Sequence, residues 1–189
     1  MVCIFLITAI YAEAGISDKN AKLIQASEKG NFADVQAVLT DGADINATEV
    51  REDSGVYVRG LTALMMASAN GRTEVVKLLL DKGADVNLKN NYGITALFMA
   101  SGNGHTEVVK LLLDNGADVN VKNTDDGVTA LFMASANGHT GIVKLLLDKG
   151  ANVNIKATID GVDYTALKMA KDLGRKDIVA ILERAGAKE

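Results

Sequence analysis

The chain has 189 residues, of which 48% are apolar and only 4% aromatic, and it contains no tryptophan and no proline. This length allows one domain with a sizeable core, and the composition excludes a disordered chain and requires an aliphatic core. The formal net charge is -4 and no basic cluster occurs, which argues against a nucleic-acid interface or an anionic membrane surface.

The chain begins with an uncharged run from Val2 to Ala12 that is apolar except for Thr8. A membrane-spanning helix needs about 20 residues, so the run is too short for one, but it has the length of the apolar part of a signal peptide. The following Glu13-Ala14 completes the small-x-small form of a cleavage site. We therefore expect a signal peptide at residues 1–14 and a periplasmic or secreted mature chain, residues 15–189, without a membrane attachment.

One feature leaves this interpretation open. No lysine or arginine follows Met1, so the basic start of a signal peptide is missing unless the natural start lies upstream. The alternative is an apolar flap over the first structural unit of a cytoplasmic protein. Cys3 is the only cysteine, and cleavage would remove it. A disulfide framework and a cysteine zinc site are therefore not expected.

The rest of the chain repeats one short unit. The triplet Thr-Ala-Leu begins at four positions and the pair Gly-Ala at five. Both recur at intervals of about 33 to 36 residues, and only the Gly-Ala series has a longer first interval. Two independent markers with the same period indicate a repeat array. The positions are Thr62, Thr95, Thr129 and Thr165 for the triplet, and Gly42, Gly83, Gly116, Gly150 and Gly186 for the pair.

Each unit resembles the ankyrin repeat. The family's opening Thr-Pro-Leu-His-x-Ala corresponds to Thr62-Ala63-Leu64-Met65-Met66-Ala67, with alanine for proline and an apolar residue for histidine. Gly104-His105 and Gly116-Ala117-Asp118-Val119-Asn120 match later landmarks. The resemblance covers about residues 18 to 189. It implies an all-α repeat solenoid, in which helix-turn-helix units carry β-hairpin fingers.

We expect five ankyrin repeats, including both caps. The polar first unit fits an N-terminal cap, and the last unit is charged where inner copies are apolar, as in a C-terminal cap. The units span residues 18–46, 60–87, 93–120, 127–154 and 161–189.

The central unit shows the expected signals of two short helices. Thr95 is placed to cap the first helix, which ends at the turn signal Asn103-Gly104. The second helix is expected to begin near Thr106 and to end before Gly116. Lys110 and Asp114 have the spacing of an exposed ion pair.

Apolar residues replace the family's histidine at the start of the first helix. These are Met65, Phe98 and Phe132, and a methionine follows each of them. Packing between repeats is the favoured interpretation, and an exposed apolar stripe is the alternative.

The first interval is longer because roughly eight residues are added within the segment 47–60. Asp53-Ser54-Gly55 is a turn signal between two β-prone runs, Thr48 to Glu52 and Val56 to Arg59, which predicts an elongated β-hairpin finger. Insertions in solenoids map to loops on one face, often the binding face. Smaller insertions on the same edge lie at Asn123 to Asp126 and Ile159 to Tyr164.

No arrangement typical of an enzyme, a cofactor site or a metal site occurs in the sequence. His105 and His139 lie one repeat apart, at a position that Arg72 and Arg175 fill in other units. A structural hydrogen bond is therefore expected there instead of metal binding. The aspartates of the Gly-Ala-Asp motifs are expected to stabilise turns.

The residues that vary among the finger tips are the candidate partner contacts. They include all three tyrosines outside the predicted leader, and tyrosine and arginine commonly anchor protein interfaces. Local packing on a neighbouring finger is the alternative for the tyrosines. The full set is Tyr57, Arg59, Leu61, Asn91, Tyr92, Ile94, Asp125, Asp126, Val128 and Tyr164.

The resemblance implies a non-enzymatic protein, which we expect to be monomeric, that binds a partner protein through its concave face and fingers. The sharper hypothesis is an exported bacterial protein that protects or inhibits an enzyme of the cell envelope. The alternative is an effector or intracellular scaffold that acts on host or cytoplasmic proteins. No cofactor and no nucleic-acid partner are expected.

Overall fold

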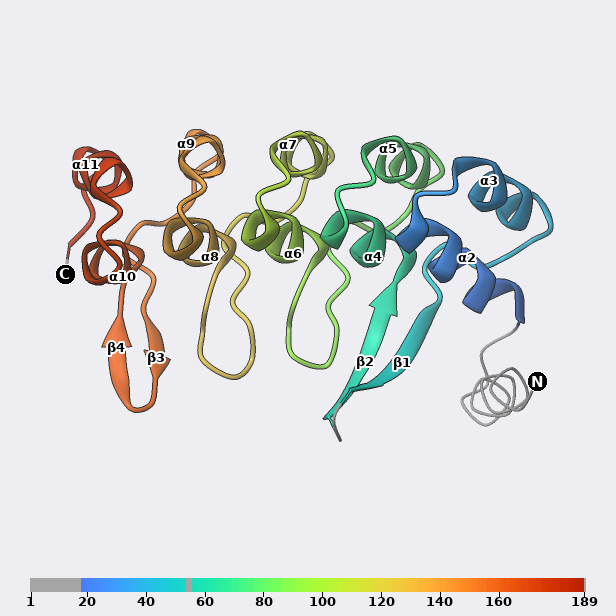
Figure 1. Ribbon diagram of the computed structural model, residues 1–189, viewed down its shortest axis with the longest axis horizontal. Helices are drawn as coiled ribbons and strands as arrows, with labels where there is room; N and C mark the ends of the chain where they lie inside the picture. The colour runs from blue at the N-terminus through green and yellow to red at the C-terminus, as the bar shows by residue number, and fades with distance from the viewer. Residues whose placement is uncertain (1–17, 54–55, 189) are drawn as a thin grey trace.

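The computed structural model describes residues 18–53 and 56–188, and within these ranges the chain forms a row of five helix pairs (Figure 1). The first helix of each pair, the inner helix, lies next to projecting loops and hairpins, and the second, the outer helix, lies on the far side. The inner helices are α2 (Asp18–Lys29), α4 (Ala63–Ala69), α6 (Ala96–Asn103), α8 (Ala130–Asn137) and α10 (Ala166–Asp172). The outer helices are α3 (Phe32–Thr40), α5 (Thr73–Asp81), α7 (Thr106–Asp114), α9 (Thr140–Asp148) and α11 (Lys176–Arg184). This arrangement confirms the predicted helical solenoid.

The predicted signal peptide, residues 1–14, lies outside the described residues and stays a prediction. Among the described residues, no helix combines the length and the apolar character that crossing a membrane requires.

Threonine side chains begin four of the inner helices, as predicted. Each threonine Oγ1 accepts a hydrogen bond from the backbone amide three residues later, at 3.2 to 3.3 Å. A cap of this kind stabilises a helix by about 1 kcal/mol, because it satisfies an amide that has no partner within the helix. The capping residues are Thr62, Thr95, Thr129 and Thr165.

The ends of the central helices also follow the sequence signals. Gly104 ends α6 with a φ of 82°, a left-handed conformation that side chains with a Cβ rarely adopt. The outer helix α7 begins at Thr106, and Gly116, one residue past its C-cap Asn115, has a φ of 84°.

The core is continuous along the stack and lies between the inner and outer helices. Small residues at the inner helices, such as Ala100 and Ser101, are fully buried and allow neighbouring helices to approach closely. Burial of one leucine side chain contributes about 2 kcal/mol to folding. Equivalent leucines repeat through the core at Leu64, Leu97, Leu131 and Leu167 on the inner helices and at Leu79, Leu112, Leu146 and Leu182 on the outer helices.

In units two to five, the residue that follows the glycine between the two helices bonds to the preceding unit, which confirms the structural role predicted for the histidines. The Nε2 atoms of His105 and His139 lie 3.0 Å from the carbonyl oxygens of Ala69 and Gly102 in the preceding inner helices. Arginines make the same connection in other units, because Arg72 Nε donates to the carbonyl of Glu28 at 3.0 Å.

A ladder of asparagines joins the turns that follow the outer helices. Asn87 Oδ1 accepts from the amide of Asp118 in the next unit at 2.8 Å, while Asp118 Oδ1 accepts from the amide of Asn120 in its own turn at 2.9 Å. The same pair of bonds recurs along the stack, with Asn152 in the place of the aspartate in unit four. The aspartates therefore stabilise turns, as predicted.

One predicted ion pair forms differently. Asp114 Oδ1 lies 2.7 Å from Nζ of Lys149, which follows outer helix α9 in the next unit. Asp114 makes this contact instead of the expected one with Lys110 on its own helix. The hydrogen bond from Lys149 is the main reason why the pKa of Asp114 is lowered. The expected pairing within the helix is therefore wrong for this residue, and the contact joins two repeats instead.

The long insertion forms the predicted β-hairpin, with strands β1 (Thr48–Asp53) and β2 (Val56–Thr62) pairing antiparallel. The register breaks between Glu49 and Val50, opposite Gly60, whose φ is 85°. The last insertion forms a shorter hairpin from β3 (Ala157–Ile159) and β4 (Val162–Tyr164). The insertion at Asn123–Asp126 is a loop, closed by a single bridge between Lys122 and Thr129.

Candidate protein-binding surface

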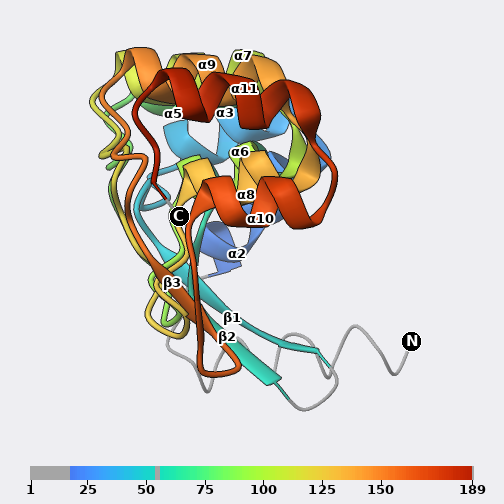
Figure 2. The same ribbon diagram turned by 90° about the vertical axis from the view of Figure 1, so that its left-hand side faces the viewer.

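Four segments project from the inner helices, and we call them the fingers: the β1–β2 hairpin, residues 88–94, residues 121–128 and the β3–β4 hairpin. Figure 2 shows that they extend away from both helix rows on one side of the stack. Since the sequence inserts residues only at this edge, the fingers are where this chain differs most from a regular array.

Hydrogen bonds join the fingers into one surface. The amide of Asn91 donates to the carbonyl of Arg59 at 2.9 Å, and the amide of Arg59 donates to Asn91 Oδ1 at 2.8 Å. Further along, the amide of Thr124 donates to the backbone carbonyl of Tyr92 at 2.9 Å, and the amide of Thr158 donates to the backbone carbonyl of Asp126 at 2.7 Å. These bonds hold neighbouring fingers at fixed spacing, so a partner meets a pre-organised surface.

The structure places eight of the ten candidate contacts on this surface. Five are exposed to solvent and three are half-buried between fingers. The exposed residues are Tyr57, Arg59, Asn91, Asp125 and Asp126, and the half-buried ones are Tyr92, Ile94 and Tyr164.

Leu61 and Val128 do not face solvent, and the expectation that they contact a partner is wrong for both. Leu61 is 5% exposed, lies opposite Glu49 in the hairpin and belongs to the main core. Val128 is 6% exposed and packs in a second apolar cluster with Phe132 and Ala157. Both follow a turn glycine, and from there the chain leads back into an inner helix.

The three tyrosines have different environments. The side chain of Tyr57 is 50% exposed, and its carbonyl accepts a bond from Asn91 Nδ2 at 3.2 Å. Tyr164 is half-buried and packs locally, with Lys168 Nζ 4.4 Å from the centre of its ring. Tyr57 is therefore the tyrosine best placed to contact a partner.

A second apolar cluster lies where the inner helices meet the last fingers. Val128, Phe132 and Ala157 are buried there, and partly buried side chains such as Met133 and Tyr164 pack against them. The burial of Phe132 and of Met65 supports packing between repeats. Other members keep part of their surface exposed next to the fingers: Phe98, Met133 and Met169.

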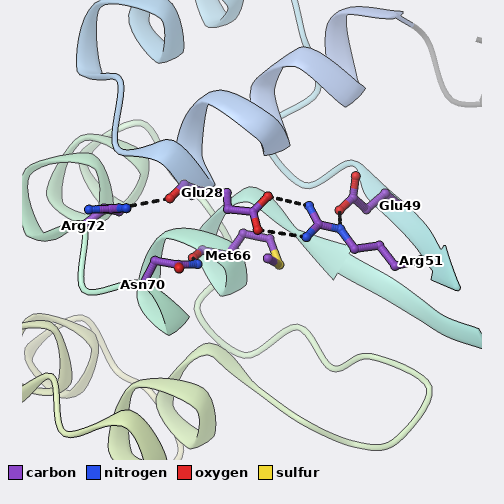
Figure 3. Close-up of polar contacts among 6 residues, drawn as sticks. All are labelled: Glu28, Glu49, Arg51, Met66, Asn70 and Arg72. Atoms are coloured by element: carbon purple, nitrogen blue, oxygen red, sulfur yellow. Dashed lines mark hydrogen bonds and ion pairs between the residues drawn. The ribbon is translucent and has the colours of Figure 1, made fainter. Parts of the chain in front are cut away.

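Sequence reasoning missed a polar cluster that anchors the long finger (Figure 3). Arg51 on β1 donates to both carboxylate oxygens of Glu28 on α2, at 3.0 and 2.8 Å, and also to Glu49 Oε1. Arg72 donates to the carbonyl of Glu28, so this residue connects the finger, the first inner helix and the second unit. The alternation of charges along β1 was the available signal, because Glu49 and Arg51 lie on one face of the strand.

The environments of the two carboxylates in this cluster differ. The side chain of Glu49 is 0% exposed and its Oε2 has no hydrogen-bond partner among the described residues. Burial raises the pKa of Glu49 in spite of the nearby guanidinium of Arg51. The bidentate hydrogen bond from Arg51 lowers the pKa of Glu28, which stays partly accessible to solvent.

Within residues 18–53 and 56–188, no group of three or more His, Cys, Asp or Glu side chains is arranged to hold a metal ion. The largest features available for recognition are the linked fingers and the adjoining inner helices. A row of rigid repeats with such a surface defines a solenoid protein that makes contacts with other macromolecules.

Comparison with protein families agrees with this description. A sequence model of ankyrin repeats (3 copies) matches residues 23–123, and one of ankyrin repeats (many copies) matches residues 103–147. The chain therefore belongs to the ankyrin-repeat family, which generally serves as a non-enzymatic protein-interaction module.

Several curated animal proteins contain a similar stretch. Human mitochondrial disaggregase is 38% identical over 76 residues, which cover 40% of this chain and 10% of that protein. Rat ankyrin repeat and SAM domain-containing protein 6 is 42% identical over 77 residues, covering 40% and 8% of the two chains. Mouse 2-5A-dependent ribonuclease is 36% identical over 78 residues, which cover 41% of this chain and 10% of that protein. The match thus spans a tenth or less of each relative.

Proposed function

We propose that this chain binds a partner protein through its fingers and the adjoining inner helices. The observation that carries this proposal is the hydrogen-bonded series of fingers, which presents Tyr57, Arg59 and Asn91 on a rigid surface. Tyrosine and arginine supply large contact areas and hydrogen bonds at interface centres. The half-buried apolar side chains beside the fingers offer an apolar contact of the kind that interface cores use.

In its sharper form, the proposal is that an exported bacterial protein protects or inhibits an enzyme of the cell envelope and acts as a monomer. The apolar run before Gly15 and its small-x-small end support export. The similar curated proteins are from animals, and they lend no support to a bacterial source. The alternative form is an effector or scaffold that acts on host or cytoplasmic proteins.

Substitution of exposed finger residues is expected to weaken partner binding. The variant combines Tyr57→Ala, Arg59→Ala and Asp125→Ala, which remove exposed side chains from two fingers. Loss of an interface anchor costs about 2 kcal/mol, so the dissociation constant is expected to rise about thirtyfold. The measurement is isothermal titration calorimetry with the partner that co-purifies with the unmodified chain.

A matched control removes three exposed lysines from the outer helices: Lys77→Ala, Lys110→Ala and Lys144→Ala. This control is expected to leave the affinity unchanged, because these side chains lie on the side opposite the fingers. Equal affinity of the finger variant and the unmodified chain, or a loss confined to the lysine variant, contradicts the proposed surface.

Export is expected to shorten the protein isolated from its natural source. Cleavage after Ala14 leaves a chain that begins at Gly15. The measurement is the intact mass of the natural protein, with peptide mapping of its N-terminus. A natural protein that retains Met1 contradicts export and favours the intracellular alternative, while leaving the finger surface untouched.

A further inference from the structure

Among the described residues, strand β1 is the first strand of the finger series, and its outer edge faces away from β2. The hairpin partner β2 covers one edge of β1, and β2 is in turn covered on its own far edge by the next finger through Arg59 and Asn91. Later fingers continue the series in the same direction. No described residue outside the hairpin bonds to the amide or carbonyl of Val50, at the centre of β1.

The pairing determines which backbone groups point outward. In an antiparallel pair, opposed residues alternate between bonding to each other and pointing away from each other. Both backbone groups of Arg59 bond to Asn91, so Arg59 points away from β1, and its register partner Val50 must point away from β2. By the same alternation, the backbone groups of Thr48 and Glu52 point outward with those of Val50.

This edge is held in place before any partner arrives. Arg51 ties β1 to Glu28 on α2, and Leu61 fixes β2 in the main core. Asn91 clamps the far edge of β2 with bonds to Arg59 and Tyr57. A strand that adds to β1 therefore does not need to order the hairpin, which lowers the entropic cost of binding.

The charge of β1 indicates what kind of strand fits. Its sequence, Thr-Glu-Val-Arg-Glu-Asp, carries three acids and one arginine, a formal charge of -2. One of these acids, Glu49, is buried and bonded to Arg51, which Glu28 also engages. Acidic edge strands repel one another, so pairing with a second copy is disfavoured. The segment 1–17 contains no lysine or arginine, so it also lacks the complementary charge.

We propose that the outer edge of β1 binds an extended, basic segment of a partner protein, which adds to the hairpin as a further strand. This surface is separate from the finger-tip side chains of the proposed function, although it rests on the same general role in protein binding. Backbone hydrogen bonds to Val50 supply the pairing, and lysine or arginine side chains on the added strand supply the charge complement.

The test uses the full chain and a synthetic peptide as long as β1 in which lysine and valine alternate. Binding is expected by fluorescence anisotropy, and it is expected to weaken as salt rises, because salt screens the attraction between the lysines of the peptide and the acidic strand. A peptide with glutamate in place of lysine is expected not to bind. Methylation of the peptide amides that face β1 is expected to abolish binding, whereas methylation of the opposite set is expected to leave it intact.

A pair of variants tests the edge from the protein side. Val50→Pro removes the outward amide and leaves the hairpin ladder intact, because this amide does not pair with β2. Val50→Ala retains the amide. The proline variant is expected to bind the peptide at least about tenfold more weakly, while the alanine variant stays close to the unmodified chain. Thermal unfolding of both variants shows whether the fold is retained.

Hydrogen exchange gives a readout that does not depend on any variant. The Val50 amide is expected to exchange rapidly in the free full chain and to become protected when the peptide is added, while the Arg51 amide stays protected in both states. Protection of Val50 in the free chain means that residues 1–17 or a second copy already cover the edge, and it overturns the proposal. Peptide binding that tolerates both Val50→Pro and methylation of the facing amides also overturns it.

The two proposals fail separately. The finger variant at Tyr57, Arg59 and Asp125 is expected to lose its natural partner while still binding the basic peptide. A variant that binds neither the natural partner nor the peptide contradicts the independence of the two surfaces. Loss of peptide binding alone, with the partner affinity intact in Val50→Pro, supports the edge as a second site.

Discussion

Arg51→Met is expected to lower the free energy of unfolding by about 3 kcal/mol, because it leaves the buried carboxylate of Glu49 without a cationic partner. Glu49 is 0% exposed and already has one oxygen without a hydrogen-bond partner among the described residues. The contact between Arg51 and Glu28 is accessible to solvent and adds less to this loss. Urea denaturation at neutral pH, followed by circular dichroism, measures the effect.

The destabilisation is also expected to depend on pH. Without Arg51, the pKa of Glu49 rises further above its ordinary value, because burial then acts without an opposing positive charge. A folded state that binds its proton more tightly than the unfolded chain loses stability as the pH rises through the raised pKa. The loss caused by Arg51→Met is therefore expected to be smaller at about pH 4 than at about pH 7.

Arg59→Ala is the matched control for this prediction. Arg59 lies on the same hairpin, but its side chain is exposed and forms no ion pair with another described residue. Its removal is expected to change the free energy of unfolding by less than about 0.5 kcal/mol. Equal effects of the two substitutions, or an effect of Arg51→Met that does not diminish in acid, contradict the role assigned to the buried carboxylate.

Leu112→Ala is expected to lower the free energy of unfolding by about 3 kcal/mol, the result of a large-to-small change at a fully buried site. Leu112 is 0% exposed and lies on α7, in the central unit, where the core continues into both neighbours. The backbone ladders along the stack keep the site from collapsing fully, so a cavity remains. Differential scanning calorimetry and urea denaturation measure the loss.

The central position of Leu112 adds a second expectation. Each repeat contacts only its neighbours, so weakening the middle unit reduces the coupling between the two ends of the stack. Unfolding of the variant is therefore expected to broaden or to separate into two transitions. Lys110→Ala, an exposed substitution on the same helix, is the control and is expected to keep a single transition of unchanged midpoint. A sharp single transition in Leu112→Ala contradicts the coupling argument.

Local signals in the sequence predicted most of the helical architecture correctly. Thr95 caps its helix and Gly104 ends it, because capping bonds and positive φ values depend on residues that are neighbours in the chain. The elongated finger also followed from local signals, namely a turn sequence between two β-prone runs. Repetition made these signals reliable, since each appears several times at the same place in the unit.

Contacts between units were harder to predict, because residues far apart in the chain make them. Asp114 pairs with Lys149 of the next repeat and not with Lys110 of its own helix. Leu61 was expected on the binding surface because it varies among the units, yet it is buried opposite Glu49. Variation among units does not distinguish a partner contact from an adjustment of local packing.

The repeated unit was enough to identify a stack of ankyrin repeats, because one unit that cannot bury its own apolar face must stack on its copies. The tertiary structure was needed to show how the fingers join, that Arg51 anchors the first of them to Glu28, and that the backbone groups of Val50 point away from β2. These features depend on backbone groups and side chains that meet across repeats, and their geometry leaves no periodic trace in the sequence.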